Sequence, residues 1–290
     1  NVSENLQSEN ISSADASYII RTPKLKARIT GFYSTIKDGT KTSFFFAEGL
    51  SGDGDDNTFV AETVTGVDKR NMGIELGFEY QVTSTIKLTA AGNYAEYIYT
   101  NNPNVTLNDD DLADELNTIP LRDFGVSSLK NYRIAGTPQQ AYSLGIEYRD
   151  PRFWWVGVNG NYLADNYLDI SPLLRTENFA IDPESNLGLP FEDYDEQTAR
   201  MLLKQEKLPD FYLLNLTGGK SWRISEKTFG FFASVNNVLD TRYKTGGFEQ
   251  SRNANYQQLY RDATNGVRPF GPKYFYGYGR TFFVNLYIQF

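Results

Sequence analysis

The side chains with the clearest capacity for chemistry are two clusters of aspartates. Asp53 and Asp55 belong to an Asp-Gly-Asp-Asp-Asn segment, and Asp109 and Asp111 flank Asp110. Carboxylate oxygens are the ligands that calcium takes in proteins. Both clusters are therefore candidates for a calcium site.

The cluster at Asp53 departs from the EF-hand calcium-binding loop. In an EF-hand loop that began at Asp53, glycine would occupy the sixth position and glutamate the twelfth. This chain has Thr58 and Val64 there. Solvated acidic loops are the favoured interpretation, no resident metal is expected, and calcium binding stays the weaker alternative.

Aromatic side chains form the second group, with 20 Tyr, 20 Phe and 3 Trp in 290 residues. The consecutive Phe44, Phe45 and Phe46 would touch a ligand, a partner protein or neighbouring loops, and packing among the loops is favoured. The same interpretations apply to aromatic residues near the C-terminus, which are Tyr256, Tyr260, Phe270, Tyr274 and Phe275. Trp154 and Trp155 follow a short turn, where a membrane-interface girdle is expected rather than a sugar-stacking platform.

Much of ordinary enzyme chemistry is missing from the composition. The chain has no cysteine and no histidine, which excludes disulfides, thiol nucleophiles, Cys or His zinc sites and the Ser-His-Asp triad. A net charge of -8 argues against a nucleic-acid partner. We expect no catalytic site and no cofactor.

Alternation of residue types shows which elements must position these side chains. Over residues 72–81 large apolar residues alternate with Gly, Glu and Gln, and Phe282, Val284, Leu286 and Ile288 alternate with polar or smaller neighbours. This period is typical of a strand with two unlike faces. The pattern predicts an all-β chain with strands at 15–22, 24–37, 69–81, 85–100, 138–149, 152–168, 209–223, 228–243 and 278–290.

The connections between these strands alternate in length. Short turns fall near residues 22–24, 82–85, 149–152 and 224–227, whereas residues 38–68, 101–137, 169–208 and 244–277 are predicted as long structureless loops. Long loops at one end and short turns at the other are expected in an outer-membrane barrel. The loops also contain much of the acid.

A transmembrane antiparallel β-barrel reconciles the abundant aromatics with the polar average. One face of each strand would meet lipid and the other a hydrated lumen, and the ladder Lys24, Lys26, Arg28, Glu75, Glu79 and Glu147 would line that lumen and pair across strands. Backbone groups in lipid must be paired, so the sheet must close. Because nine strands is an odd count, the chain is predicted to be the C-terminal part of a larger barrel.

Several motifs give the chain a specific resemblance. They are Tyr18 to Arg28, Ala135 to Tyr142, Asn236 to Asp240 with Tyr243, and Tyr276 to Phe282 running into Phe290. With these motifs the chain resembles the C-terminal half of a TonB-dependent receptor, of the kind common in Bacteroidetes outer membranes. The likeness covers most of the chain outside the loops.

The resemblance implies a 22-stranded barrel plugged by an N-terminal domain, with energy delivered by TonB. It implies uptake of a siderophore, oligosaccharide, peptide or cobalamin, with outer-membrane lipid and a surface lipoprotein or other outer-membrane subunit as further partners. It also implies extracellular loops, periplasmic turns and a barrel-assembly signal at Phe290. No plug, TonB box or signal peptide is found in these residues. The alternative is an accessory barrel subunit of a larger outer-membrane assembly, without transport of its own.

Overall fold

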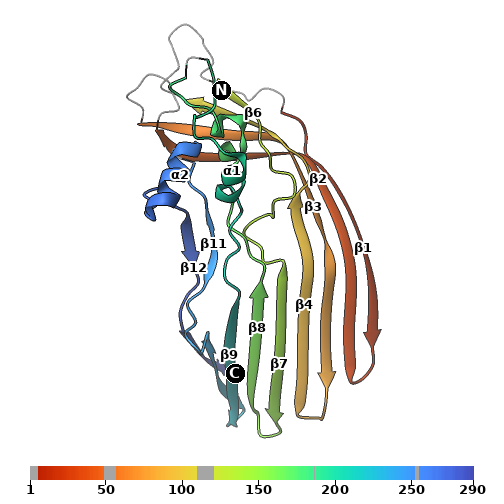
Figure 1. Cartoon of the computed structure of the whole chain (residues 1–290). Helices are drawn as coiled ribbons and strands as arrows, with labels where there is room; N and C mark the ends of the chain where they lie inside the picture. Colours follow the sequence, from red (N-terminus) through yellow and green to blue (C-terminus); the bar gives the residue numbers. More distant parts are fainter. Residues whose placement is uncertain (1–5, 49–56, 110–120, 186, 252–254) are drawn as a thin grey trace.

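The computed structural model describes residues 6–48, 57–109, 121–185, 187–251 and 255–290. Its main feature is a curved antiparallel sheet, drawn from β1 at the right edge of Figure 1 towards the C-terminus. The sheet follows chain order, with hairpin neighbours pairing throughout. The main path of this 11-stranded sheet is β1 (Asn10–Arg21), β2 (Leu25–Glu48), β3 (Asn57–Gln81), β4 (Ile86–Tyr99), β7 (Gln140–Asp150), β8 (Trp154–Ala164), β9 (Phe211–Ile224), β10 (Lys227–Asn236) and β13 (Thr281–Gln289). Two short strands, at residues 104–109 and 121–126, join the sheet through β3.

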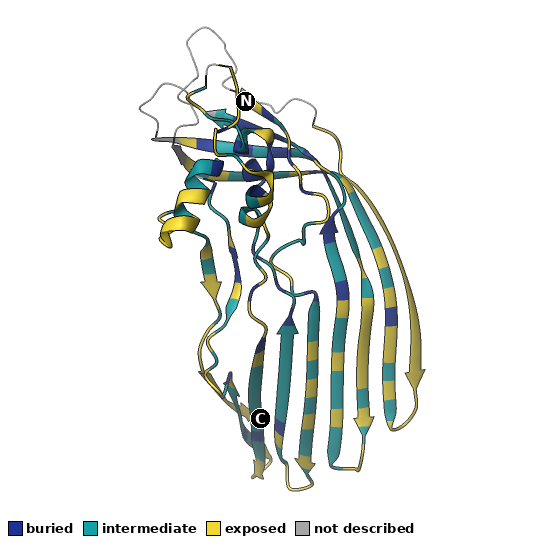
Figure 2. Ribbon diagram, in the orientation of Figure 1, coloured by how far each residue is buried: buried dark blue, intermediate teal, exposed yellow. Residues whose placement is uncertain are grey.

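One face of this sheet, here called the outward face, is apolar in continuous register. Leu88 of β4 lies opposite Ile146 of β7, which lies opposite Val158 of β8, and Val158 lies opposite Leu216 of β9. Side chains on this face are left uncovered: Leu144 is 70% and Leu286 79% exposed. Figure 2 shows exposed and partly buried residues alternating along β7. The predicted two-faced strand is therefore present.

The opposite face, here called the inward face, carries the polar residues. Lys26 forms an ion pair with Glu79 at 3.0 Å, and Glu147 pairs with Lys87 at 3.4 Å and with Arg149 at 2.6 Å. Lys26–Glu79 and Lys87–Glu147 are cross-strand pairs, and pairs of this kind stabilise a sheet by about 0.2–1 kcal/mol each, whereas Arg149 and Glu147 lie on the same strand. Within the predicted ladder Lys26 pairs with Glu79, but Arg28 donates to the hydroxyls of Ser17 and Thr30.

The two adjacent tryptophans lie on different faces. Trp154 is on the outward face, with its ring 5.1 Å from that of Tyr148. Trp155 is on the inward face, where it stacks on Phe232 at 5.9 Å and lies under the guanidinium of Arg149 at 5.2 Å. The prediction that both belong to an interfacial girdle is wrong for Trp155, because successive side chains of a strand point to opposite faces.

In the residues that the structure describes, all four long connections contain folded segments, which corrects the prediction that they are structureless. In the first, β2 and β3 continue past a bend as a paired arm, residues 39–48 with 57–67. The arm bends where the register shifts, and Asp38 and Gly66 have φ of 57° and 72° there. Figure 1 shows it crossing the loop end of the sheet towards α2. A local bulge and left-handed residues thus redirect a strand that the alternation alone would end at residue 37.

The other connections contain short elements around a common core. They are β5 (Asn104–Asp109), β6 (Leu121–Val126), η2 (Leu173–Arg175), η3 (Glu177–Phe179), α1 (Glu196–Leu202), β11 (Lys244–Phe248), α2 (Tyr256–Asn265) and β12 (Lys273–Tyr276). Asp195 caps α1 by accepting from the Thr198 amide, and Asn255 caps α2 by accepting from that of Gln258. No helix of the described ranges is long and apolar enough to cross a membrane.

The core of the loops joins residues from all four connections. Val60 and Val64 of the arm pack with Val105 and Leu107 of β5, with Leu173 of η2 and with Tyr256 of α2. Burial of a large aliphatic side chain contributes about 1.5–3 kcal/mol. The loops therefore fold together as a cap on one end of the sheet.

Gly277 provides room for an aromatic stack at the base of the last connection. A Cβ at this position would collide with the ring of Tyr243, which stacks on Phe211 at 4.3 Å. We expect Gly277→Ala to displace Tyr243 and lower the free energy of unfolding by about 1–3 kcal/mol, the usual cost of overpacking. Thermal unfolding in detergent measures this. Gly31→Ala is the control, because nothing lies within 4 Å of a Cβ there; an equal effect of both changes would contradict the interpretation.

Candidate functional site

A cavity of about 990 Å³ lies between the arm and the third and fourth connections. Its walls combine aromatic rings, charged side chains and exposed backbone. The lining residues used below are Lys41, Glu62, Tyr99, Asp169, Phe248 and Glu249, together with Phe44, Phe45 and Phe46. This volume lies at the upper end of the range of small-molecule sites, roughly 300–1,000 Å³.

A charge pair crosses the cavity wall. Lys41 Nζ lies 2.7 Å from Asp169 Oδ2, and both side chains are about one-third exposed. Burial by itself lowers the pKa of Lys41, but the charge of Asp169 reverses this and the pKa is raised. The pair therefore offers a charged donor and an acceptor to hydrogen-bonding groups of a solute.

Glu62 is the most deeply buried acid of the cavity. The residue is 2% exposed, and one carboxylate oxygen accepts from the hydroxyl of Ser43 at 2.6 Å, whereas Oε1 has no hydrogen-bond partner. Burial raises the pKa of Glu62 despite the opposing effects of Ser43 and Lys41. A buried carboxyl with an unsatisfied oxygen favours its neutral form.

A second ion pair fixes the back of the cavity. Arg175 is buried, and its guanidinium contacts the Glu249 carboxylate at 2.6 and 3.0 Å. It also donates to the carbonyls of Ser171 and Leu203 and lies 4.6 Å from the Tyr132 ring centroid. Burial opposes the charge of Arg175, but Glu249 outweighs that effect and raises its pKa. This geometry holds the third and fourth connections together.

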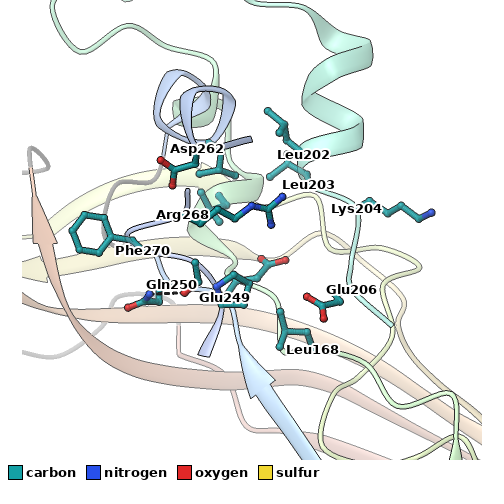
Figure 3. Close-up of a pocket in the computed structure, with 14 residues that line it drawn as sticks. Leu168, Leu202, Leu203, Lys204, Glu206, Glu249, Gln250, Asp262, Arg268 and Phe270 are labelled. Atoms are coloured by element: carbon teal, nitrogen blue, oxygen red, sulfur yellow. Dashed lines mark hydrogen bonds between the residues drawn. The ribbon is translucent and has the colours of Figure 1, made fainter. Parts of the chain in front are cut away.

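A smaller pocket of about 120 Å³ adjoins the other side of Glu249. Figure 3 shows Arg268 and Glu206 directed into the same space, below Leu202 and Leu203, with Phe270 at its edge. Gln250 closes one side by donating to the Gly271 carbonyl at 2.6 Å. Its volume is too small for most solutes, so the larger cavity is the candidate site.

The predicted phenylalanines divide between the core and the surface. Phe45 packs against the loop core, whereas Phe44 and Phe46 are 64% and 57% exposed. Both exposed rings contact Phe59, at 6.0 and 5.3 Å between centroids. All three line the cavity, so loop packing and ligand contact remain compatible for this segment.

The remaining aromatic candidates divide among the loop core, the smaller pocket and the larger cavity. Tyr256 is 1% exposed, and its ring packs against Phe179, Phe191 and Tyr194. Tyr260 stacks on Tyr256, and Phe270 lines the smaller pocket. Tyr274 donates to Glu206 at 2.7 Å; burial and this carboxylate raise its pKa to about 12. None of these four rings lines the larger cavity, whereas Phe275 does line it and packs against Phe248 at 5.9 Å between ring centroids.

The structure tests neither the predicted calcium ligands nor the predicted role of Phe290 in barrel assembly. Asp53, Asp55 and Asp111 lie outside the described residues, and only the backbone of Asp109, at the end of β5, is described. Within the described ranges, no three or more Asp or Glu side chains gather as a metal site. Phe290 is 89% exposed, with Lys227 Nζ 4.7 Å from its ring centroid, and its role in assembly stays a prediction.

The alternation predicted neither charge pair of the cavity. Lys41 and Asp169 are 128 residues apart, and Arg175 and Glu249 are 74 apart. The only local signal is the Val60-x-Glu62-x-Val64 spacing, which places one acid in register with two valines. A charged residue on an otherwise apolar face suggests burial with a function or a partner.

Comparisons with known proteins agree with this architecture. Residues 1–238 match the family model described as TonB dependent receptor-like, beta-barrel. No curated protein matches. Among solved structures, the copper transporter OprC has a TM-score of 0.53 at 19% identity, over 98% of this chain and 32% of that chain.

A second similar structure is the FrpB iron transporter from Neisseria meningitidis (F3-3 variant). Its TM-score is 0.51 at 13% identity, over 99% of this chain and 32% of that chain. The chain thus spans about a third of the length of both transporters, and at these identities the likeness shows the fold. Because the family model matches most of the sequence, the chain belongs to the TonB-dependent receptor β-barrel family of the outer membrane.

Proposed function

We propose that this chain forms the C-terminal part of a receptor that captures a scarce solute in the cavity of about 990 Å³ and imports it with energy from TonB. A siderophore, an oligosaccharide, a peptide and a cobalamin are all solutes of this kind. The proposal rests on family membership together with one observation: the folded connections enclose a cavity at one end of the sheet. The two similar structures are a copper transporter and an iron transporter, which favours transport.

We further propose that the folded connections face the exterior and the short turns the periplasm. At the turn end, Ser225 and Glu226 alone join β9 to β10, both with positive φ as two-residue hairpins require. At the other end the connections enclose rings and charges. Long outer loops and short periplasmic turns are the usual arrangement of such barrels.

The cavity fits a solute that has both an apolar part and hydrogen-bonding groups. Tyr99 and Phe248 provide aromatic surface, and the Lys41–Asp169 pair provides a donor and an acceptor. Paired polar groups in a mostly apolar cavity orient a ligand. The pair is therefore expected to determine affinity.

Removal of both charges tests this proposal without leaving either one unpaired. We expect Lys41→Ala with Asp169→Ala to weaken solute binding at least tenfold, or about 1.4 kcal/mol. Growth of a deletion strain under iron limitation and under glycan limitation first identifies the solute, and direct binding to the purified receptor then gives the affinity. Lys26→Ala with Glu79→Ala is the matched control, because it removes an inward pair at the other end of the sheet. If both double variants bound the solute with equal affinity, the cavity would be excluded as the binding site.

Energy coupling is tested separately in cells without TonB. Uptake should fall to the background of the receptor deletion, while solute binding at the cell surface persists. Full uptake without TonB would instead support an accessory barrel.

A further inference from the structure

A groove of about 590 Å³ opens on the outward face, at the loop ends of β2, β3, β4 and β7. Its lower part is apolar and uncovered: Tyr33 is 50%, Ile74 53% and Tyr94 62% exposed, and Met72 lies between them. These residues belong to the face that carries the continuous apolar register. In a barrel of this family that face meets lipid, so the groove opens into the membrane.

A compact charged cluster borders the top of the groove. Arg70 Nη2 lies 2.7 Å from Glu96 Oε2, and Arg133 Nη1 lies 2.6 Å from Glu96 Oε1. Two guanidiniums around one carboxylate leave a local charge of +1. Each guanidinium has five N–H donors, so both retain donors for a further anion.

Arg70 supplies an independent sign that the cluster is incomplete. Its Nε is buried and has no hydrogen-bond partner, although the side chain as a whole is 32% exposed. Buried donors of this kind are usually satisfied. A tetrahedral oxyanion next to the cluster can accept from two N–H groups of one guanidinium at once.

The position of the groove matches the boundary between hydrocarbon and water. Tyr142, Tyr162 and Tyr212 stack across β7, β8 and β9, with centroids 6.3 and 4.7 Å apart. The hydroxyl of Tyr162 donates to Asp210, which also pairs with Lys207. A row of tyrosines next to charges is typical of a membrane interface.

We propose that this groove binds one anionic, phosphate-bearing lipid. Its acyl chain lies against Tyr33, Ile74 and Tyr94, and its phosphate receives hydrogen bonds from Arg70 and Arg133. The lipid is the occupant because the groove opens into the bilayer, because its lower part is apolar, and because the cluster above has two guanidiniums around one carboxylate and one donor, Arg70 Nε, without a partner. Asp165 also lines the groove, and it shares the ammonium of Lys207 with Asp210, at 2.5 and 3.4 Å.

Native mass spectrometry of the intact gene product tests this proposal. The protein is purified in detergent and titrated with phosphatidylglycerol, or with phosphatidylcholine of the same acyl chains. We expect one phosphatidylglycerol to remain bound to each protein after collisional activation, at least fivefold more often than phosphatidylcholine. Arg70→Ala with Arg133→Ala should remove this preference. Lys220→Ala should keep it, because Lys220 is an outward-face cation at the turn end of β9.

A gel assay and a second double variant distinguish loss of lipid binding from loss of the folded barrel. Heat-modifiable gel mobility reports whether each barrel is folded. Arg70→Lys with Arg133→Lys keeps the charge but removes the planar guanidiniums, and we expect an intermediate retention. The proposal would be overturned if both double variants retained phosphatidylglycerol as the wild type does, or if the wild type retained the two lipids equally. It would also be overturned if Lys220→Ala lost the preference as the double variants do, or if millimolar inorganic phosphate displaced the lipid.

Discussion

Replacing Glu249 with alanine should release the back of the cavity and expose the third and fourth connections. The change leaves the guanidinium of Arg175 buried without its carboxylate, since only 1% of that side chain is exposed. Removing one partner of a buried ion pair costs about 3–5 kcal/mol. Because the pair joins two loops and not two strands, local rather than global unfolding is expected.

Hydrogen exchange of the backbone amides measures this local loss. The Ser171 amide donates to the Glu249 carboxylate at 2.9 Å, so its protection reports directly on the variant. A loss of 3–5 kcal/mol corresponds to a fall in protection of roughly two to four orders of magnitude. Amides in β7 and β8 should keep their wild-type protection.

Glu196→Ala is the matched control for this prediction. Glu196 and Arg200 also form an ion pair at 2.6 Å, but their side chains are 71% and 78% exposed. Exposed pairs of this kind contribute about 0.3–0.5 kcal/mol. Equal protection of Ser171 in both variants would show that burial of Arg175 does not matter. An apolar replacement of both partners, Arg175→Met with Glu249→Leu, should be less damaging than Glu249→Ala because no charge is left buried.

Glu62→Gln should stabilise the arm at neutral pH and leave its stability at acidic pH almost unchanged. The physical reason is the raised pKa of the buried Glu62 carboxyl. In the folded state the Glu62 carboxyl keeps its proton at pH values where the unfolded chain has released it, because an ordinary glutamate has a pKa of about 4.3. Stability is therefore lost as pH rises from the ordinary pKa through the raised one, and it stays low above that value.

The glutamine variant removes this pH dependence because its amide carries no titrating proton. It keeps an acceptor for the Ser43 hydroxyl, which lies 2.6 Å from the carboxylate in the wild-type protein. The gain at neutral pH is about 1–3 kcal/mol, the usual cost of a buried polar group that lacks its partner. Protection factors of amides in residues 60–65, corrected for intrinsic exchange, measure the effect between pH 5 and pH 8.

Two further variants make the assignment specific to Glu62. Ser43→Ala removes a hydrogen bond that favours the ionised form, so it should raise the pKa of Glu62 further and extend the loss of arm stability to higher pH. Glu196→Gln changes an exposed glutamate and should leave the arm unaffected. The assignment fails if arm protection in Glu62→Gln follows the wild-type pH dependence.

The strand pattern could be predicted because its physical cause is local. A strand with one apolar face and one hydrated face needs residues of alternating type, so residues 72–81 and 281–290 indicate strands without knowledge of their neighbours. The short turns follow from the same argument, because each ends one alternating segment and begins the next. The family motifs then indicated which barrel these strands belong to, and the family model confirms it.

The candidate site could be predicted only in part. Phe44, Phe45 and Phe46 do line the cavity, but Tyr256 is in the loop core and the charged residues were missed. The arm was missed as well, because its bend depends on Asp38 and Gly66 in the left-handed region and on two register shifts between β2 and β3, which alternation does not encode. Short segments with weak alternation adopt strands and helices here because the core around Tyr256 covers them.

By itself the sequence determined the all-β class, the two unlike faces of the sheet and the alternation of short turns with long connections. The tertiary structure alone decided that those connections fold together, that they enclose a cavity and which charges meet in it. Alternation depends on neighbours two residues apart, whereas Lys41 meets Asp169 across 128 residues and Arg175 meets Glu249 across 74. A buried charge acquires its pKa and its contribution to stability from the partner that folding brings to it, and no local pattern encodes that partner.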